Sequence, residues 1–223
     1  MNPLVARSLA CSARADAGGM LWAGGSACPT GGAGLQPARL FLATLLLLPI
    51  LCASCARREP LQDLGSVPRF HLTDQTGNTF DSASLAGRVW VADFIYTTCP
   101  GPCPLMSARM RRIQTATKGI AAVRLVSFTV DPEHDTPTVL AEYAKRFAAD
   151  ESRWTFLTGE PRKLNELGVN VFHLNSVDGN LVHSTRFALV DREGRIRKYY
   201  ASDEEGFLDK IVRDVKELEA ARP

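Results

Sequence analysis

Two cysteines, Cys99 and Cys103, carry the chemistry that this sequence is best suited to perform. They are separated by three residues, two of which are Pro100 and Pro102, and they follow a short apolar run that ends near Phe94. A strand that ends at such a turn and passes into a helix places both sulfurs near the helix N-terminus, where the helix dipole favours thiolates. The pattern therefore favours either metal binding by thiolates or thiol–disulfide exchange.

The other cysteines narrow these choices. Four of the six cysteines fall within the first 60 residues, so only Cys99 and Cys103 belong to the remaining segment. A purely structural disulfide between them would close too short a loop to restrict the unfolded chain much. A structural zinc site usually has four protein ligands, and the histidines show no paired metal-ligand spacing. Soft thiolates favour Cu(I) among the metals, with a third ligand from elsewhere, and a redox-active dithiol stays open as the alternative.

Four histidines are candidates for that third ligand: His71, His134, His173 and His183. A single histidine is usually a surface residue or a hydrogen-bonded core residue. His183 differs because it stands just before the run Arg186–Asp191, which indicates a buried strand that leads into a hairpin turn. The leading edge of that strand can face the cysteine turn, so the sequence favours His183.

The first 60 residues differ in character from the rest. Residues 1–39 are rich in glycine and alanine and show no pattern, so we expect an unstructured or misassigned extension. Residues 40–56 lack charge, and as a helix they would span roughly 25 Å, short of the roughly 30 Å membrane core. This run predicts a signal peptide, a lipoprotein signal or a membrane anchor, with Cys55 as the candidate lipidation site. We therefore expect a membrane-anchored domain on the periplasmic, extracytoplasmic side.

The charge balance excludes one class of partner. Residues 61–223 carry 21 Lys and Arg against 22 Asp and Glu, and the signs are interspersed along the chain. Nucleic-acid-binding domains show a basic stripe instead, often with interleaved aromatic residues. The sequence therefore predicts no nucleic-acid partner.

Strands and helices alternate along the remaining segment. The expected strands are 89–94, 124–130, 154–157, 186–191 and 196–200, and the expected helices are 105–117, 136–147, 161–167 and 204–218. The run 70–78 indicates an edge strand and hairpin that contains His71 as a surface residue. This order, with a dithiol after the first core strand, predicts an α/β, thioredoxin-like fold. We expect a single domain at 67–220, with a central mixed sheet flanked by helices and a linker at 57–66.

Three nearby side chains receive structural interpretations. Asp131 precedes a proline directly after a buried strand, so we expect it to start a turn or cap the following helix. The alternative is that Asp131 shapes the metal pocket or a partner surface. We expect Phe94 and Tyr96 to pack against the sheet rather than to act as ligands.

Three motifs then suggest a family. They are FIYTTCPGPCP at 94–104, SFTVDPEHDTP at 127–137, and His183-Ser184, and they span most of residues 65–220. In this order they resemble the Sco/SenC family of copper chaperones. The resemblance implies that Cys99, Cys103 and His183 bind one copper ion. Members of the family often have an acidic residue just before the histidine, whereas this chain has Val182, a difference that affects the surroundings of the imidazole rather than the ligand itself.

The resemblance also implies partners. It predicts delivery of copper to the binuclear copper site in cytochrome c oxidase subunit II. Two thiolates and one imidazole suit Cu(I) and can accept a further weak ligand for Cu(II). Outside the cytoplasm the pair can form a Cys99–Cys103 disulfide, so loading requires a thiol reductant, and another copper carrier is a possible source of the metal. The same redox pair could reduce cysteines of the recipient. The alternative is an extracytoplasmic thiol–disulfide oxidoreductase that uses the pair without copper and does not need His183.

Overall fold

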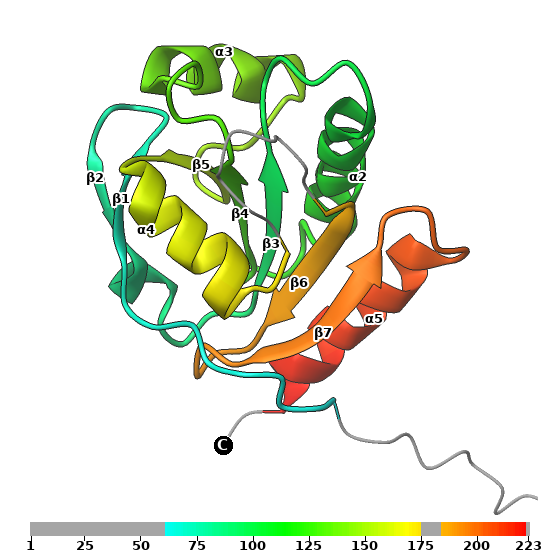
Figure 1. The fold of residues 1–223 in the computed structure, drawn as a ribbon. Coiled ribbons are helices and arrows are strands. Elements are labelled where there is room, and N and C mark those ends of the chain that lie inside the picture. The colour runs from blue at the N-terminus through cyan, green and yellow to red at the C-terminus, as the bar shows by residue number, and fades with distance from the viewer. Residues whose placement is uncertain (1–60, 175–183, 222–223) are drawn as a thin grey trace, which may run out of the picture. The chain divides into compact units, whose positions relative to one another are not determined.

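The computed structural model describes residues 61–174 and 184–221, which fold around a seven-stranded mixed sheet (Figure 1). The strand order is β2-β1-β5-β4-β3-β6-β7. The strands are β1 (His71–Asp74), β2 (Thr79–Asp81), β3 (Trp90–Ile95), β4 (Arg124–Thr129), β5 (Trp154–Thr158), β6 (Arg186–Val190) and β7 (Ile196–Ala201). The α-helices are α2 (Pro102–Ala116), α3 (Pro137–Arg146), α4 (Pro161–Asn165) and α5 (Phe207–Ala220).

Strand β3 lies inside the sheet and is buried along its whole length. It runs parallel to β4 and antiparallel to β6, and β4 in turn runs parallel to β5. Parallel strands covered on both faces are expected to form continuous apolar runs, and five of the six residues of β3 are apolar. Its C-terminal end, at Ile95, opens into the cysteine turn, so we call this side of the molecule the cysteine end.

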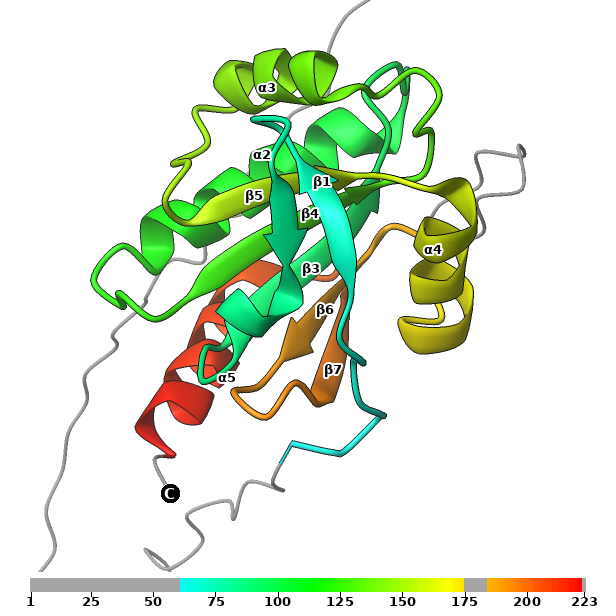
Figure 2. The ribbon, with the colours of Figure 1, turned by 90° about the vertical axis from the view of Figure 1, so that its left-hand side faces the viewer.

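Helices cover both faces of the sheet (Figure 2). Apolar residues of α2, α3 and α5 form one core cluster with Val91 and Ile95 of β3. The even-numbered residues of β3, such as Trp90 and Phe94, form the second cluster with Leu164 of α4. The predicted layered fold and the edge position of the β1–β2 hairpin are thereby confirmed.

The starts of two helices differ by three residues from the sequence expectation. Helix α2 begins at Pro102 rather than at residue 105, because a proline fits the first helical turn, where its missing N–H has no partner to lose. Cys103 therefore lies inside the helix. Helix α5 begins at Phe207 rather than at residue 204, since Gly206 adopts a left-handed conformation with φ of 68° and ends the preceding turn.

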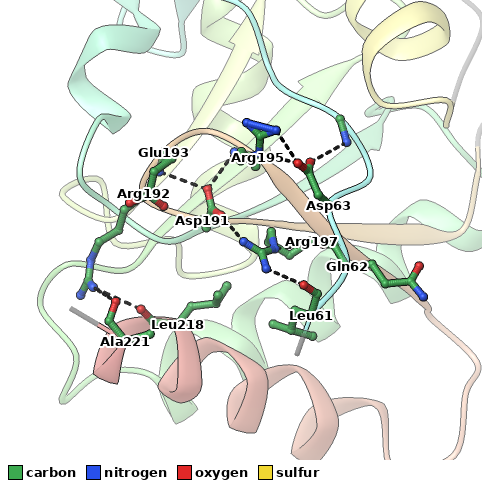
Figure 3. Close-up of polar contacts among 11 residues, drawn as sticks. Leu61, Gln62, Asp63, Asp191, Arg192, Glu193, Arg195, Arg197, Leu218 and Ala221 are labelled. Carbon is green, nitrogen blue, oxygen red and sulfur yellow. Dashed lines mark hydrogen bonds and ion pairs between the residues drawn. The ribbon is translucent and has the colours of Figure 1, made fainter. Parts of the chain in front are cut away.

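Residues 61–67 are fastened to the sheet at the end opposite the cysteines. Arg195 donates to the Asp63 carboxylate at 2.7 Å, and Arg197 donates to the carbonyl oxygens of Gln62 and Leu61 (Figure 3). The same Arg197 bonds the buried Asp191 carboxylate at 2.8 Å. We call these contacts the arginine clasp. Residues 61–63 of the segment 57–66, which was expected to be a linker, are thus bound to the hairpin between β6 and β7.

No helix within the described parts of the chain is long and apolar enough to cross a membrane. The run at 40–56, where the sequence predicts a signal or anchor, lies outside the described residues, as does the extension at 1–39.

Candidate functional site

Both domain cysteines lie where β3 ends and α2 begins. The backbone N–H of Cys99 donates to the carbonyl of Tyr96 at 3.4 Å, which closes the turn after the strand. Cys103 occupies the first turn of α2, and its Sγ accepts a hydrogen bond from the backbone N–H of Tyr96 at 3.5 Å. Cys103 is fully buried, whereas Cys99 keeps 6% of its surface exposed. Cys99 is therefore the sulfur that an incoming molecule can meet first.

The two thiols interact with each other but are not joined as a disulfide in this structure. Burial raises the pKa of the Cys99 thiol, but hydrogen bonds from the backbone N–H groups of Cys103 and Gly101 outweigh it, and the net pKa is lowered. For Cys103, burial dominates, and its pKa is raised well above the ordinary value. The helix start thus favours the thiolate on Cys99, while Cys103 remains a thiol.

Tyr96 packs against both core clusters, as expected, and it also belongs to the site. Its hydroxyl hydrogen-bonds the Cys99 side chain, and this bond, together with burial and nearby negative charge, raises the pKa of Tyr96 to about 12. Phe94, by contrast, is buried in the core and stacks on Phe128 at a centroid distance of 5.0 Å, as expected. Strand alternation would place Phe94 and Tyr96 on the same face, but β3 ends at Ile95, so this alternation does not apply to Tyr96.

Asp135 connects the cysteine turn to the end of β4. Its buried carboxylate accepts hydrogen bonds from the Thr97 hydroxyl at 2.5 Å, from the Thr97 backbone N–H at 3.2 Å and from the Thr129 hydroxyl at 2.5 Å. Burial raises the pKa of Asp135, although these donors oppose that shift. The carboxylate holds Thr97, two residues before Cys99, in a fixed position against the sheet.

Asp131 starts the turn before α3, as the sequence predicts. Its carbonyl accepts from the N–H groups of His134 and Asp135, and Thr136 caps the helix. The Asp131 carboxylate also pairs with His134 Nδ1 at 2.9 Å, and this hydrogen bond raises the pKa of the exposed imidazole. Asp131 contributes to the raised pKa of Tyr96, which places its charge near the cysteine turn.

A buried carboxylate lies on the face of the sheet that α2 covers. Asp93 of β3 is fully buried, and its Oδ1 accepts a hydrogen bond from the Ser127 hydroxyl at 2.5 Å, while Trp154 donates to the same hydroxyl at 2.9 Å. Its Oδ2 has no hydrogen-bond partner among the described residues. Burial raises the pKa of Asp93 to about 7, and the Asp93 charge in turn contributes to the raised pKa of Cys103.

Asp93, Thr97 and Asp135 are site residues that were not predicted from the sequence. The sequence did contain an indication of Asp93, since it is the one charged residue in the apolar strand sequence WVADFI. It contained none of Asp135, because its partner Thr97 lies 38 residues away in the sequence and only the fold brings them together.

The third copper ligand expected from the sequence, His183, lies outside the described residues. Its neighbour in the structure is Ser184, whose N–H donates to the Leu174 carbonyl at 3.2 Å. Strand β6 then begins at Arg186 and runs antiparallel to β3, with Val190 opposite Trp90, so β6 begins at the cysteine end.

Two other candidate histidines, His71 and His173, have partners outside the cysteine turn. His71 is exposed on strand β1 and pairs with Asp81 at 3.5 Å, and His173 bonds the Val169 carbonyl at 2.8 Å. Within residues 61–174 and 184–221, no three side chains of His, Cys, Asp or Glu gather closely enough to hold a metal ion. Cys55, the candidate lipidation site, also lies outside the described residues.

Comparisons with known proteins agree with this architecture. Residues 59–219 match the family model SCO1/SenC. A SCO1/SenC family lipoprotein from Bacillus anthracis is 34% identical, with a TM-score of 0.66 over 74% of this chain and 99% of that one. BsSco, a Sco-family cytochrome c oxidase assembly protein with a disulfide switch, is 33% identical, with a TM-score of 0.66 over 74% of this chain and 100% of its own.

A copper-bound relative also shares the fold. ScoI from Bradyrhizobium japonicum, solved with copper bound, is 26% identical, with a TM-score of 0.57 over 68% of this chain and 98% of its own. The matched region contains the sheet, the four α-helices and both cysteines of the turn. The thioredoxin-like fold expected from the sequence is confirmed by these relatives, and the chain belongs to the SCO1/SenC family.

Proposed function

We propose that this protein is a copper chaperone that holds one copper ion between the sulfurs of Cys99 and Cys103. The observation that carries the proposal is the convergence of the two thiols, which interact with each other at the start of α2. Thiolates are soft ligands that favour Cu(I), so the donor set suits this metal as cargo. The copper-bound ScoI relative supports the same choice of metal.

His183 supplies the third ligand in this proposal. Two thiolates and one neutral imidazole form a three-coordinate environment that suits Cu(I) and leaves one side open for exchange with an acceptor. The support for His183 is topological, because β6 starts at the cysteine end and His183 precedes it by three residues.

The proposed recipient is the binuclear copper site of cytochrome c oxidase subunit II. The support is family membership, together with the described role of BsSco in cytochrome c oxidase assembly. We further propose that the domain is tethered to the membrane on its extracytoplasmic side, either through lipidated Cys55 or through an anchor at residues 40–56. The lipoprotein relative from Bacillus anthracis supports a tether of this kind.

A second candidate function is thiol–disulfide exchange, favoured by the contrast between the two sulfurs. The Cys99 thiolate would attack a partner disulfide, form a mixed disulfide and release one partner thiolate. Cys103 would then attack Cys99, so that the Cys99–Cys103 disulfide forms and the partner gains its second thiol. An external thiol reductant would return the pair to the dithiol. The lowered pKa and partial exposure of Cys99 suit the first step.

An anaerobic Cu(I) titration of the reduced protein against a competing chelator separates the two functions. We expect one tightly bound copper per chain, and we expect Cys103→Ser and His183→Ala each to weaken binding by more than about 100-fold, since even indirect changes around a metal ligand cost about 10- to 100-fold. His71→Ala, which removes an exposed histidine on β1, is the matched control and should bind as the wild type does. Binding that is weak, or that does not depend on His183, would contradict the three-ligand site and favour thiol exchange.

A further inference from the structure

The surface of α2 combines an exposed apolar side chain with three arginines. Leu105 keeps 52% of its surface exposed, although most large apolar residues of the domain are buried. Arg111 and Arg112 are exposed and Arg109 is half-buried on the same helix. We call these four residues the α2 patch.

The charges of the α2 patch are not compensated on their own helix. Helix α2 contains no acidic residue, although the domain as a whole is near neutral. Within the described parts of the chain, none of the three arginines forms an ion pair, whereas arginines elsewhere, such as Arg192, Arg195 and Arg197, do. Cations that the fold does not pair are available to a partner.

A small cleft of about 200 Å³ borders the α2 patch and is lined by Arg109, Arg112 and residues at the start of α5. The guanidinium of Arg109 lies over the Phe207 ring at 5.9 Å, and its Nη1 has no hydrogen-bond partner among the described residues. The cleft also contains Glu204, which is already paired with Lys210 at 2.5 Å, and Asp209. A carboxylate that enters the cleft from outside would meet the guanidinium groups of Arg109 and Arg112, which line it.

The α2 patch begins beside the sulfurs. Leu105 follows Cys103 by two residues. At about 1.5 Å of rise per residue, Arg109 and Arg112 lie roughly 9 and 14 Å along the helix from Cys103. A protein that takes copper from Cys99 must bring its own ligands into contact with this turn. A standard interface is wide enough to cover both the turn and the α2 patch.

We propose that the α2 patch is the docking surface for the copper-accepting protein, and that the acceptor presents carboxylates beside its copper ligands. This inference rests on the proposed chaperone function. Leu105 provides an apolar contact next to the exchanging sulfur, and the arginines steer the acidic surface into register.

Charge reversal of two exposed arginines tests the proposal. The variant R111E/R112E is compared with R162E/K163E, which makes the same change in charge on α4, on the opposite face of the sheet. The probe is the soluble copper-binding domain of cytochrome c oxidase subunit II, and the readouts are the copper transfer rate and the affinity of the copper-free proteins. At low salt we expect R111E/R112E to slow transfer about 10-fold and to flatten its salt dependence, while the control remains near wild type.

A second variant distinguishes the apolar contact of Leu105 from the electrostatic attraction of the arginines. Leu105→Ala should weaken the complex about fivefold at every salt concentration, because an apolar contact is not screened. Equal rates for R111E/R112E and R162E/K163E, or faster transfer by R111E/R112E, would overturn the docking surface. R111E/R112E and Leu105→Ala should both bind as much copper per chain as the wild type does. A wild-type protein that binds no copper would instead refute the chaperone function itself.

Discussion

Asp93 is the residue whose environment differs most from that of an ordinary aspartate. It is fully buried on the face that α2 covers, and one of its oxygens has no hydrogen-bond partner within the described residues. Burial raises the pKa of its carboxyl to about 7. Below that pH the group is neutral in the folded protein, and above it the folded protein must hold a buried charge.

Asp93→Asn should therefore change how stability depends on pH. In the unfolded chain Asp93 loses its proton near pH 4, but in the folded chain it keeps it until about pH 7, so the folded state binds more protons between these values. The contribution of Asp93 to the free energy of unfolding is therefore fully present below pH 4. It decreases as the pH rises to 7, by at most about 4 kcal/mol. Asp93→Asn removes this loss.

Urea unfolding of the reduced protein at pH 4.5 and pH 8 measures the effect. The free energy of unfolding of Asp93→Asn, relative to wild type, should be higher at pH 8 than at pH 4.5. Asp203→Asn, at an exposed position, is the control and should follow the wild type. Identical pH profiles for Asp93→Asn and wild type would show that Asp93 does not titrate in this range.

Among the elements, the cysteine turn depends on the loop that follows β4. Asp135 in that loop accepts three hydrogen bonds from Thr97 and Thr129, all of them in partly or fully buried surroundings. The turn itself contains proline and glycine and makes few backbone hydrogen bonds of its own. Its shape is therefore set by a side chain from another element.

Thr97→Val should lower the free energy of unfolding by about 1–3 kcal/mol, because it keeps the side-chain shape but removes one donor to a buried carboxylate. Chemical denaturation checks the value, and amide hydrogen exchange at the turn should speed up. Thr138→Val, at an exposed position in α3, is the matched control. A Thr97→Val protein as stable as this control would mean that the Asp135 contact contributes little.

The sequence predicted the elements better than the contacts between them. The strands, the four helices and the position of both cysteines after the first core strand followed from local patterns of apolar residues and from prolines and glycines. The role of Asp135 did not, because its partner Thr97 lies 38 residues away in the sequence. Pattern analysis detects which residues are buried, but not which polar groups meet there.

At the scale of the whole domain, the arginine clasp fixes where the chain enters. Arg197 bonds the backbone of Leu61 and Gln62 and the Asp191 carboxylate, and residues 64–67 add backbone hydrogen bonds to Gly194 and Ile196. These contacts lie at the end of the sheet opposite the cysteine turn, since Val190 at the end of β6 pairs with Trp90 at the start of β3. The chain therefore enters the domain at the end away from the sulfurs.

Arg197→Ala should release this entry segment. It removes the hydrogen bonds to residues 61 and 62 and one donor to the buried Asp191 carboxylate, so we expect a loss of about 1–3 kcal/mol in stability. Limited proteolysis should cut within residues 61–66 faster than in wild type. Arg162→Ala, which removes an exposed arginine on α4, is the control. Unchanged cleavage in Arg197→Ala would show that the backbone bonds alone hold the segment.

The sequence by itself determined the thiol pair, its place between a strand and a helix, and the α/β order, because these depend on residues that are close together in the chain. Only the tertiary structure decided that Asp135 holds Thr97 from 38 residues away, that β6 begins beside the end of β3, and that Asp93 is buried with Ser127 from the neighbouring strand. These contacts follow from strand pairing between distant segments. A local pattern does not encode such pairing, since the entropy of closing long loops is offset only by burial across the whole sheet.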